Sequence, residues 1–452
     1  MSSDLLNIGS SGLNAYRGAL ATVSENVTNA NSEGYTRRRI VLTESPVSSG
    51  TSILYRPQVT FGGVNVGAIT RSWDQFKAAD ARRAGTEAGE ASAKYSWMTN
   101  LETALNDGES GIGTRLTQVF TKADELSADP NGDFPRRAFL NAIDETASAF
   151  RQTASDLSRL ADNIETQASA KADLINSDLT TLGRLNVQLR KAGVGTSTYA
   201  QASDERDRIL DEVAGLVNID VTYDDYGGVT VTLANDPDKV LVKDATAALV
   251  GVQRAPDGQI GFLLSSAAIG STIFTPSGGE LAALQSAAEQ LAGRRTQLDG
   301  IATDFATALN DWSAAGLDVN NNAGQPMLDA TGGAIALTPL ITDPDLGPPP
   351  NATDGAFGNL ATLSSTVRTA SGAEDRWTAL VASHAQVVSS SKTNVDVTSA
   401  RKDIAFSARD SVSGVDLDQE AADLLRFQQA YSACAHIIQV ARDTLDEILQ
   451  LF

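Results

Sequence analysis

Large side chains recur every seven residues along the C-terminal end of the chain, and this spacing restricts the possible folds more than any other feature. A heptad of this kind is the pattern of a helix that packs lengthwise against another helix. A single helix cannot bury such a stripe by itself, because an isolated helix is only marginally stable in water. The large positions are Leu417, Leu424, Tyr431, Ile438, Leu445 and Phe452, and a second row holds Phe427, Cys434, Ala441 and Ile448.

The first 30 residues carry a similar stripe, at steps of seven, three and four residues. It ends at residues 29–34, which supply the Asn and Gly of a turn. We therefore expect two helical ends that pair with each other or with neighbouring copies, and that are poorly ordered in the free monomer. The N-terminal stripe consists of Leu6, Leu13, Tyr16, Leu20, Val23 and Val27.

The interior of the chain predicts long helical rods. The longest predicted helix spans 136–192, and at about 1.5 Å per residue it would be roughly 80 Å long, so the molecule must be elongated. Shorter helices are predicted at 88–105, 113–126, 203–214 and 374–409. The longest helix carries Ile143, Phe150, Leu157 and Ile164 at steps of seven, with Leu160, Leu174, Leu182, Leu185 and Leu189 extending the stripe, and heptads resume with Leu284, Leu291, Leu298, Phe305 and Trp312.

Residues 216–275 change to the alternating pattern of β-strands. Residues 217–221 and 229–233 alternate apolar and polar side chains, and the turn residues 224–228 between them predict a hairpin. Short strands or an extended excursion are also expected within 36–73. The predicted fold class is mainly α with an inserted β-rich module, a multidomain α+β architecture in which the terminal helices pair as a coiled coil and the β domain points outward.

The chain has 452 residues, which corresponds to about three domains at roughly 100–200 residues each. We expect an inner coiled-coil domain made of 1–35 with 412–452. A helical rod domain would combine 36–202 with 279–315 and 360–411. An outer β-rich module would combine 203–278 with 316–359, a stretch rich in Gly, Asn, Asp and Pro.

The charge balance excludes several partners. The chain has 35 Lys and Arg against 56 Asp and Glu, a net charge of −21, so it would repel nucleic acid and anionic membrane surfaces. No apolar run is long enough to insert into a membrane. The N-terminus lacks the pattern of a cleaved secretory signal, so export would need another route. With Cys434 as its only cysteine, the chain cannot form an internal disulfide.

Few side chains suggest catalysis. Cys434 and His436 lie two residues apart and so do not share a helix face, which favours a packing role for Cys434. His384 falls on an apolar face and is interpreted as a packed histidine. The arginines at 37–39 are interpreted as a solvated or subunit-contact patch.

Two loops resemble ligand sites only in part. Residues 318–324 place oxygen-bearing side chains as a calcium loop begins, but lack the Gly and the bidentate Glu of an EF-hand, so a polar turn is favoured. The glycines at 61–67 lack the Lys-Ser/Thr of a phosphate loop. We therefore predict no catalytic residue, no cofactor and no metal site.

Both ends resemble the axial proteins of the bacterial flagellum. The N-terminal run from Leu20 to Arg38 contains Asn-Ala-Asn at 29–31 and Gly-Tyr at 34–35, a pattern shared by rod, hook and junction proteins. The C-terminal run from Ser413 to Tyr431 is more specific. It has Leu-Leu at 424–425 and Gln-Gln at 428–429, where hook proteins usually carry Met-Ile and Gln-Arg. The closest resemblance is to the FlgK-type hook-associated family, from which His436 departs because Lys is common there.

The resemblance implies a structural subunit of the hook–filament junction that acts as the seat for a second junction protein and the filament. Its implied partners are identical copies in a ring, the hook protein, the second junction protein and an export chaperone at the C-terminal region. The implied location is the extracellular flagellum, after type III export without a cleaved signal peptide. The expected assembly residues are Leu13, Leu20, Val23, Asn26, Asn29, Asn31, Gly34, Tyr35, Leu417, Leu424, Phe427, Gln428, Tyr431, Ile438 and Leu445.

Three alternatives stay open at this point. The chain could be another axial protein, such as a hook or distal rod component. It could be a secreted coiled-coil adaptor, which would form small oligomers in solution. It could also carry a catalytic module between axial ends, although residues 216–275 contain no convergent His, Cys or paired acids.

Overall fold

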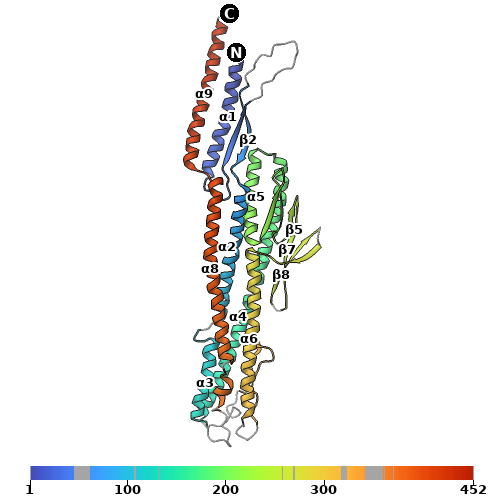
Figure 1. Ribbon diagram of the computed structural model, residues 1–452, viewed down its shortest axis with the longest axis vertical. Coiled ribbons are helices and arrows are strands. Elements are labelled where there is room, and N and C mark those ends of the chain that lie inside the picture. The colour runs from blue at the N-terminus through green and yellow to red at the C-terminus, as the bar shows by residue number, and fades with distance from the viewer. Residues whose placement is uncertain are drawn as a thin grey trace.

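The structure is an elongated molecule with helices along its length and a small β-rich module on one side (Figure 1). It is a computed structural model that describes residues 2–44, 62–105, 108–130, 132–256, 258–267, 270–316, 323–341, 360, 362–369 and 371–450. Far more residues lie in helices than in the short strands, and all the described sheets are antiparallel. The predicted fold class, mainly α with an inserted β-rich module, is confirmed.

The two ends of the chain form one antiparallel helix pair. Helix α1 (Ser2–Thr28) and helix α9 (Leu417–Gln450) lie side by side, and both chain ends are at the same tip of the molecule (Figure 1). A hairpin of β1 (Arg38–Glu44) and β2 (Val64–Arg71) packs against α1. The ends therefore pair with each other, which was one of the two arrangements allowed by their sequence.

The rod consists of long helices that share one apolar core. Helix α4 (Asp133–Ala192) has 60 residues, and its heptad positions are buried against α6 (Gly279–Ala315). The rings of Phe150 on α4 and Phe305 on α6 stack with centroids 6.4 Å apart. Leu174 was expected on the buried stripe, but its side chain is 47% exposed because it lies on the opposite face of α4 from its core neighbours. The remaining rod helices are α2 (Gln75–Leu105), α3 (Ile112–Ala128), α5 (Ser197–Leu216), α7 (Leu363–Val367) and α8 (Ala373–Ser413).

Helix α2 begins thirteen residues before its predicted start. Its added turns bury Ala78, Ala81 and Ala84, and the second and third of these form a small cluster with Ala405 of α8. Alanines give no periodic signal of large apolar side chains, so the sequence pattern missed this part of the helix. The α2–α8 contact is correspondingly a close one, built on small side chains.

Seven short strands form the β-rich module, as the alternating pattern predicts. One sheet orders β3 (Ile219–Tyr223), β4 (Val229–Leu233), β5 (Asp236–Lys243) and β6 (Thr246–Ala247). The other orders β7 (Leu249–Arg254), β8 (Ile260–Ser266) and β9 (Gly270–Phe274). Both sheets pack against α4.

Asparagine side chains of α4 hold the two sheets. Asn186 accepts a hydrogen bond from the Val229 backbone N–H at 2.7 Å and donates one to the Val229 carbonyl at 2.9 Å. Asn176 makes the same pair of bonds with the backbone of Val250, at 2.7 and 2.9 Å. An asparagine amide offers one acceptor and an N–H donor, as a peptide group does. Each asparagine side chain therefore makes the two hydrogen bonds with the strand backbone that a neighbouring strand would otherwise make.

Residues 323–341 lie against the rod. They contain β10 (Leu328–Asp329), a 3₁₀ turn η1 (Ala334–Ala336) and β11 (Thr338–Pro339). Asn310 of α6 donates to the Leu328 carbonyl at 2.8 Å, and Asp299 accepts from the Ala334 N–H at 2.8 Å. The expectation groups 316–359 with the β-rich module, whereas this part packs on α4 and α6. The prolines at 348–350 and most of the 318–324 loop lie outside the described residues.

Replacing Asn186 with Asp should destabilise the rod. The carboxylate cannot donate to the Val229 and Asp244 carbonyls that Asn186 now contacts, so two acceptors would face a negative charge. We expect a loss of about 2–3 kcal/mol in unfolding free energy, measured by urea denaturation followed by circular dichroism. The exposed Asn163→Asp on the same helix is the control, and an equal loss in both variants would contradict the strand-like role of Asn186.

Asp178 should make the stability of the rod depend on pH. This side chain of α4 is buried, and burial together with Glu212 of α5 raises its pKa to about 6, although Arg208 opposes the rise. Because the folded-state pKa lies above the unfolded one, the ionised group costs stability at neutral pH, and that stability returns as pH falls from about 7 towards 4. Asp178→Asn should add roughly 1–2 kcal/mol at pH 7 and flatten this dependence. If the unfolding free energy of Asp178→Asn depended on pH as that of the unaltered chain does, Asp178 would not be the source of this dependence.

Candidate functional site

The candidate assembly site is the terminal helix pair together with the contacts that anchor it to the rod. Helix α1 turns its small residues towards α9. A Cβ added at Gly12 would lie 2.5 Å from Cys434 Sγ, and one at Gly9 would lie 2.6 Å from Ile438 Cγ1. Distances this short are forbidden for real side chains, so these glycines allow the two backbones to approach closely.

This small-residue contact changes the interpretation of the N-terminal heptad. The buried apolar side chains of α1 are Ala15, Ala19 and Val23, while Leu13 and Leu20 are only half-buried. Of the large side chains expected in the α1 seam, Val23 is therefore buried, whereas Leu13 and Leu20 are not. When helix axes approach this closely, only small side chains fit between them, and large ones lie at the edges of the contact. Val27, expected in the stripe, is exposed.

Helix α9 places its expected assembly residues on more than one face. Phe427 packs near Tyr16 of α1, with ring centroids 6.3 Å apart. Leu424, Ile438 and Leu445 are half-buried, and the small Ala441 is fully buried. Leu417, Gln428 and Tyr431 are exposed. The structure therefore gathers part of the predicted set into the pair and leaves the rest on its outer surface.

Asn26 joins the helix pair to the start of the hairpin. Its amide accepts from the Arg38 N–H at 2.9 Å and donates to the Arg38 carbonyl at 2.9 Å. The same amide donates to Glu420 of α9 at 3.0 Å and accepts from the Tyr35 hydroxyl at 2.8 Å. Burial raises the pKa of Tyr35 to about 12, so this hydroxyl keeps the proton that it donates. Of the other expected residues in this turn, Asn29 is half-buried, whereas Asn31 and Gly34 are exposed.

Arg37 fastens the start of α9. Its Nε lies 2.6 Å from Glu420 Oε1, and its Nη1 donates to Gln419 at 2.9 Å. Its backbone N–H donates to the Ser413 carbonyl at 2.8 Å, next to the bend between α8 and α9. Arg37 and Arg38 are 9% and 4% exposed, so the predicted solvated or subunit-contact patch is wrong for both. Buried carboxylates compensate their charges, and only Arg39 is exposed.

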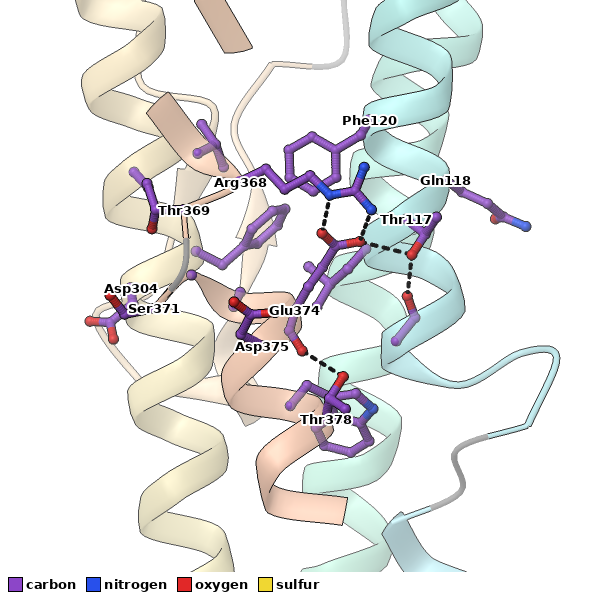
Figure 2. A pocket seen from close by; sticks show the side chains of 18 of the residues that line it. Thr117, Gln118, Phe120, Asp304, Arg368, Thr369, Ser371, Glu374, Asp375 and Thr378 are labelled. Atoms are coloured by element: carbon purple, nitrogen blue, oxygen red, sulfur yellow. Dashed lines mark hydrogen bonds and ion pairs between the residues drawn. The ribbon is translucent and has the colours of Figure 1, made fainter. Parts of the chain in front are cut away.

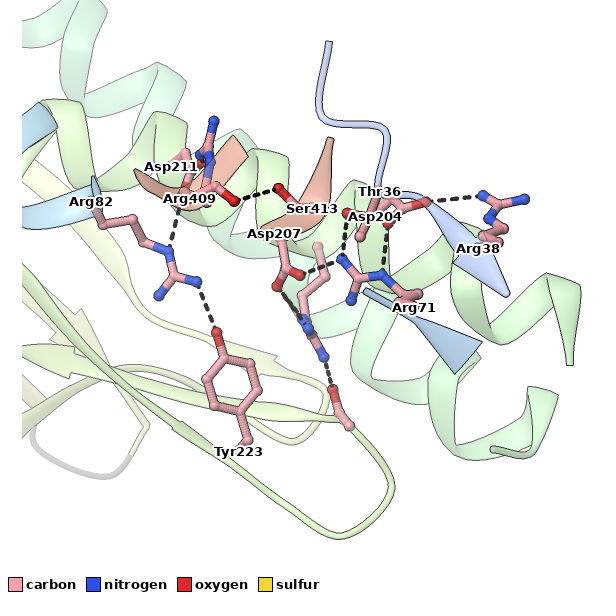
Figure 3. A network of polar contacts seen from close by, with 12 residues as sticks. Thr36, Arg38, Arg71, Arg82, Asp204, Asp207, Asp211, Tyr223, Arg409 and Ser413 are labelled. Carbon is pink, nitrogen blue, oxygen red and sulfur yellow. Dashed lines mark hydrogen bonds and ion pairs between the residues drawn. The ribbon is translucent and has the colours of Figure 1, made fainter. Parts of the chain in front are cut away.

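Arg38 and Arg71 tie the hairpin to α5 (Figure 3). Arg38 contacts Asp204 at 2.9 Å and Glu25 at 2.7 Å. Arg71 contacts the other oxygen of Asp204 at 2.7 Å and Asp207 at 2.7 Å. Burial by itself would raise the pKa of Asp207, but neighbouring arginines, including Arg71, outweigh it and hold the pKa below its usual range. This carboxylate is therefore ionised and paired.

One turn further along α5, Asp211 joins three elements. It contacts Arg82 of α2 at 2.9 Å and Arg409 of α8 at 2.7 Å, and Arg82 also donates to the Tyr223 hydroxyl of β3 at 2.9 Å (Figure 3). Burial raises the pKa of Asp211, and the two arginines oppose this only in part. The anchor therefore continues from the hairpin through α5 into the rod.

The sequence contained a signal for this anchor that the pattern analysis missed. Asp204, Asp207 and Asp211 recur at steps of three and four, so they share one face of a helix. Apart from Arg206, which pairs with the adjacent Asp207, the arginines that meet them lie more than 100 residues away in the chain. Local spacing predicts that the acids share a face, but it cannot name their partners.

A hollow of about 930 Å³ lies at the other end of the rod, between α3, α6 and α8 (Figure 2). Several of its polar side chains have ionic or hydrogen-bond partners. Glu374 contacts Arg368 at 2.6 Å and accepts from Thr117 at 2.8 Å, while Arg368 lies over the ring of Phe120. Asp304 pairs with Arg376. The hollow holds no arrangement of nucleophile and base among these residues.

The histidines and the cysteine lie in packing or surface contacts rather than in a catalytic arrangement. His384 is buried, and its Nε2 lies 2.9 Å from the Met98 carbonyl, as expected for a packed histidine. Cys434 lies against Gly12, and burial raises the pKa of its thiol. His436 contacts Gln439 instead. Within the described ranges, no three metal-ligating side chains converge and no helix is long and apolar enough to cross a bilayer.

Comparisons with known families agree with this architecture. Residues 6–36 match the flagella basal body rod protein model, and residues 408–451 match the model of the C-terminal region of flagellar basal body rod FlgEFG proteins. The paired ends therefore define an axial protein of the bacterial flagellum. Residues 98–328, just over half of the chain, match the flagellar hook-associated protein FlgK helical domain. The chain belongs to the FlgK family of flagellar hook-associated structural proteins.

Individual relatives are distant. Flagellar hook-associated protein 1 of Escherichia coli is 27% identical over 72% of this chain and 59% of its own length. The Bacillus subtilis protein of that name is 24% identical over 97% of this chain and 96% of its own length. The structure of the flagellar hook junction protein FlgK from Burkholderia pseudomallei is similar in fold, with a TM-score of 0.51 at 21% identity, over 56% of this chain and 46% of that one.

Removing the charge of Arg71 should weaken the anchor. Arg71→Met leaves Asp204 and Asp207 buried with fewer cations, and breaking a buried pair in this way costs about 3–5 kcal/mol. Urea denaturation should show this loss. Arg401→Met is the control because Arg401 is exposed and its contact with Glu87 is 3.6 Å long, so we expect a change of less than about 0.5 kcal/mol. Similar losses in the two variants would refute the anchor.

Proposed function

We propose that this chain is a structural subunit of the junction between the flagellar hook and filament. Identical copies form a ring on the hook protein, and the ring is the seat for the second junction protein and the filament. The subunit leaves the cytoplasm by the type III route without a cleaved signal peptide, after an export chaperone has held its C-terminal region. It works without a cofactor and catalyses no reaction.

The observation that supports this proposal most is the nearly uncharged surface along the middle of the terminal helix pair. Between residues 424 and 440, α9 carries one charged side chain, Arg426, and between residues 5 and 24, α1 carries only Arg17. Large apolar side chains are nevertheless exposed there, with Leu425 at 59% and Val440 at 61%. Exposed apolar patches of this kind are typical of interaction surfaces. Copies of a chain with a net charge of −21 can therefore meet through this surface without strong repulsion.

The relatives' names support the assignment to the junction. Both curated relatives are called flagellar hook-associated protein 1, and the similar structure is described as a flagellar hook junction protein. Another axial role, in the hook or distal rod, remains the alternative because the matches at both ends are to rod-protein models. Gene deletion separates the two. Complete hooks without filaments, with flagellin shed into the medium, support the junction role, whereas absent hooks indicate a position lower in the axis.

Order in the free monomer is a separate part of the proposal. We propose that the terminal helices become stable only on assembly, because their exposed apolar side chains lack a partner in one copy. Hydrogen exchange of the monomer should then be faster in residues 5–27 and 417–450 than in 136–192. Equal protection of all three segments would argue against folding on assembly.

Charge placed on the terminal pair should block incorporation into flagella. Val440→Asp puts a carboxylate on the outer surface, and Ile438→Asp puts one against Gly9 in the contact with α1. We expect both to reduce incorporation at least about tenfold, which corresponds to roughly 1.4 kcal/mol, while the rod stays folded by circular dichroism. Asn163→Asp adds the same charge on α4 as a control. Normal flagella from either test variant would count against the assembly surface.

A further inference from the structure

The first turn of α9 exposes an apolar side chain between two acids. Leu417 is 53% exposed, and Asp416 and Asp418 flank it. Asp416 accepts from the Asp418 and Gln419 N–H groups at 3.0 and 3.3 Å, so it caps the helix. Capping accounts for Asp416, but not for an exposed leucine beside an exposed Asp418. We call residues 416–418 the acidic knob.

A groove of opposite character lies on the rod. It has a volume of about 730 Å³ and lies between the last turns of α4, the start of α5 and the β5–β6 turn. Gly183, Val187 and Ala245 give it an apolar lining, and the exposed cations Arg184 and Lys191 belong to the same lining. Among the described residues neither cation lies within 4 Å of a carboxylate, although the pKa of Glu205 on α5 is lowered by its hydrogen bond with Arg208 and, more weakly, by the charge of Arg184. We call this feature the basic groove.

Cations near the end of α4 also favour its helix dipole, so their presence needs no partner by itself. The dipole does not account for an open apolar lining between them. In the knob, likewise, the helix dipole accounts for acids at the start of α9 but not for the exposed apolar side chain of Leu417. Each half therefore has an apolar centre flanked by charges of one sign, and the signs are opposite. This charge complementarity identifies the occupant as a second copy of the same chain.

The two features belong to elements that lie at a similar height along the molecule. In Figure 1 the bend between α8 and α9, next to the knob, lies to the left of α5, whose start borders the groove. Contact between two different patches of neighbouring copies is head-to-tail, and repetition of such a contact by rotation closes a ring. Because the knob and the groove lie at a similar position along the long axis, a contact between them would place neighbouring copies side by side in a ring rather than one above another.

We propose that the acidic knob of each copy docks into the basic groove of the next copy. Leu417 enters the apolar lining beside Val187, and Asp418 faces Arg184 and Lys191. The apolar contact supplies most of the binding, because exposed ion pairs contribute about 0–1 kcal/mol each. The charges set which patch meets which. This contact rests on the proposed ring and names the residues that join its subunits.

Cross-linking in assembled flagella tests the contact directly. One chain carries Gln188→Cys in the groove and Asp418→Cys in the knob, with Cys434→Ala to remove the native thiol. Oxidation should then join neighbours into a ladder of covalent oligomers. The control chain carries Gln188→Cys with Lys392→Cys on α8, and should stay monomeric on denaturing gels. A ladder in the control but not in the test chain would overturn the proposal.

Charge reversal gives a second readout that does not depend on oxidation. Lys191→Glu should lower incorporation roughly fivefold, because a carboxylate would face Asp418 at every contact in the ring. Adding Asp418→Lys to the same chain should restore incorporation, while Lys392→Glu should have no effect. Failure of the second change to rescue the first overturns the docking. Hooks that carry filaments in the deletion strain would instead refute the junction role, so the two failures can be told apart.

Discussion

The architecture depends on a single kind of hydrogen bond, in which a helical asparagine binds the backbone of a strand through both halves of its amide. Backbone N–H and C=O groups must be paired when they are buried, and a long helix cannot extend a sheet. The asparagine amide solves this because it reproduces the donor and acceptor of a peptide group. The same arrangement occurs at Asn26 with β1, at Asn176 with β7, at Asn186 with β4 and at Asn310 with β10.

Buried charge then fixes the direction of the terminal helices. Asn26 meets Glu420, Glu420 meets Arg37, and the adjacent Arg38 meets Asp204 of the rod. Each carboxylate in this series has a cation or amide partner, so the cost of its burial is offset. The helix pair carries few charges along its middle, whereas its base is densely charged. The uncharged part is left free for other subunits, and the charged part sets its angle to the rod.

The sequence predicted those parts of the fold in which large apolar side chains repeat. The heptads of α4 and α6, the alternation of the β-rich module and the packed His384 follow from local pattern alone. The pattern failed where small residues make the contact, at Gly12 against Cys434 and at Ala81 of α2. It also placed Arg37 and Arg38 in solvent, because their acidic partners are distant in sequence. Contacts between small side chains, and ion pairs between residues far apart in the chain, produce no repeating pattern of large apolar residues in the sequence.

The meeting of both chain ends at one tip has a consequence for synthesis. Asn26 and Glu420 are 394 residues apart, so α1 leaves the ribosome long before its partner exists. At about 5–20 residues per second the wait lasts roughly 20–80 s, while helices α3 to α6, which contact nearer neighbours, can already pack together. The terminal pair is therefore the last contact that the chain can close. Helix α1 is therefore available to other proteins throughout that interval, before α9 has been made.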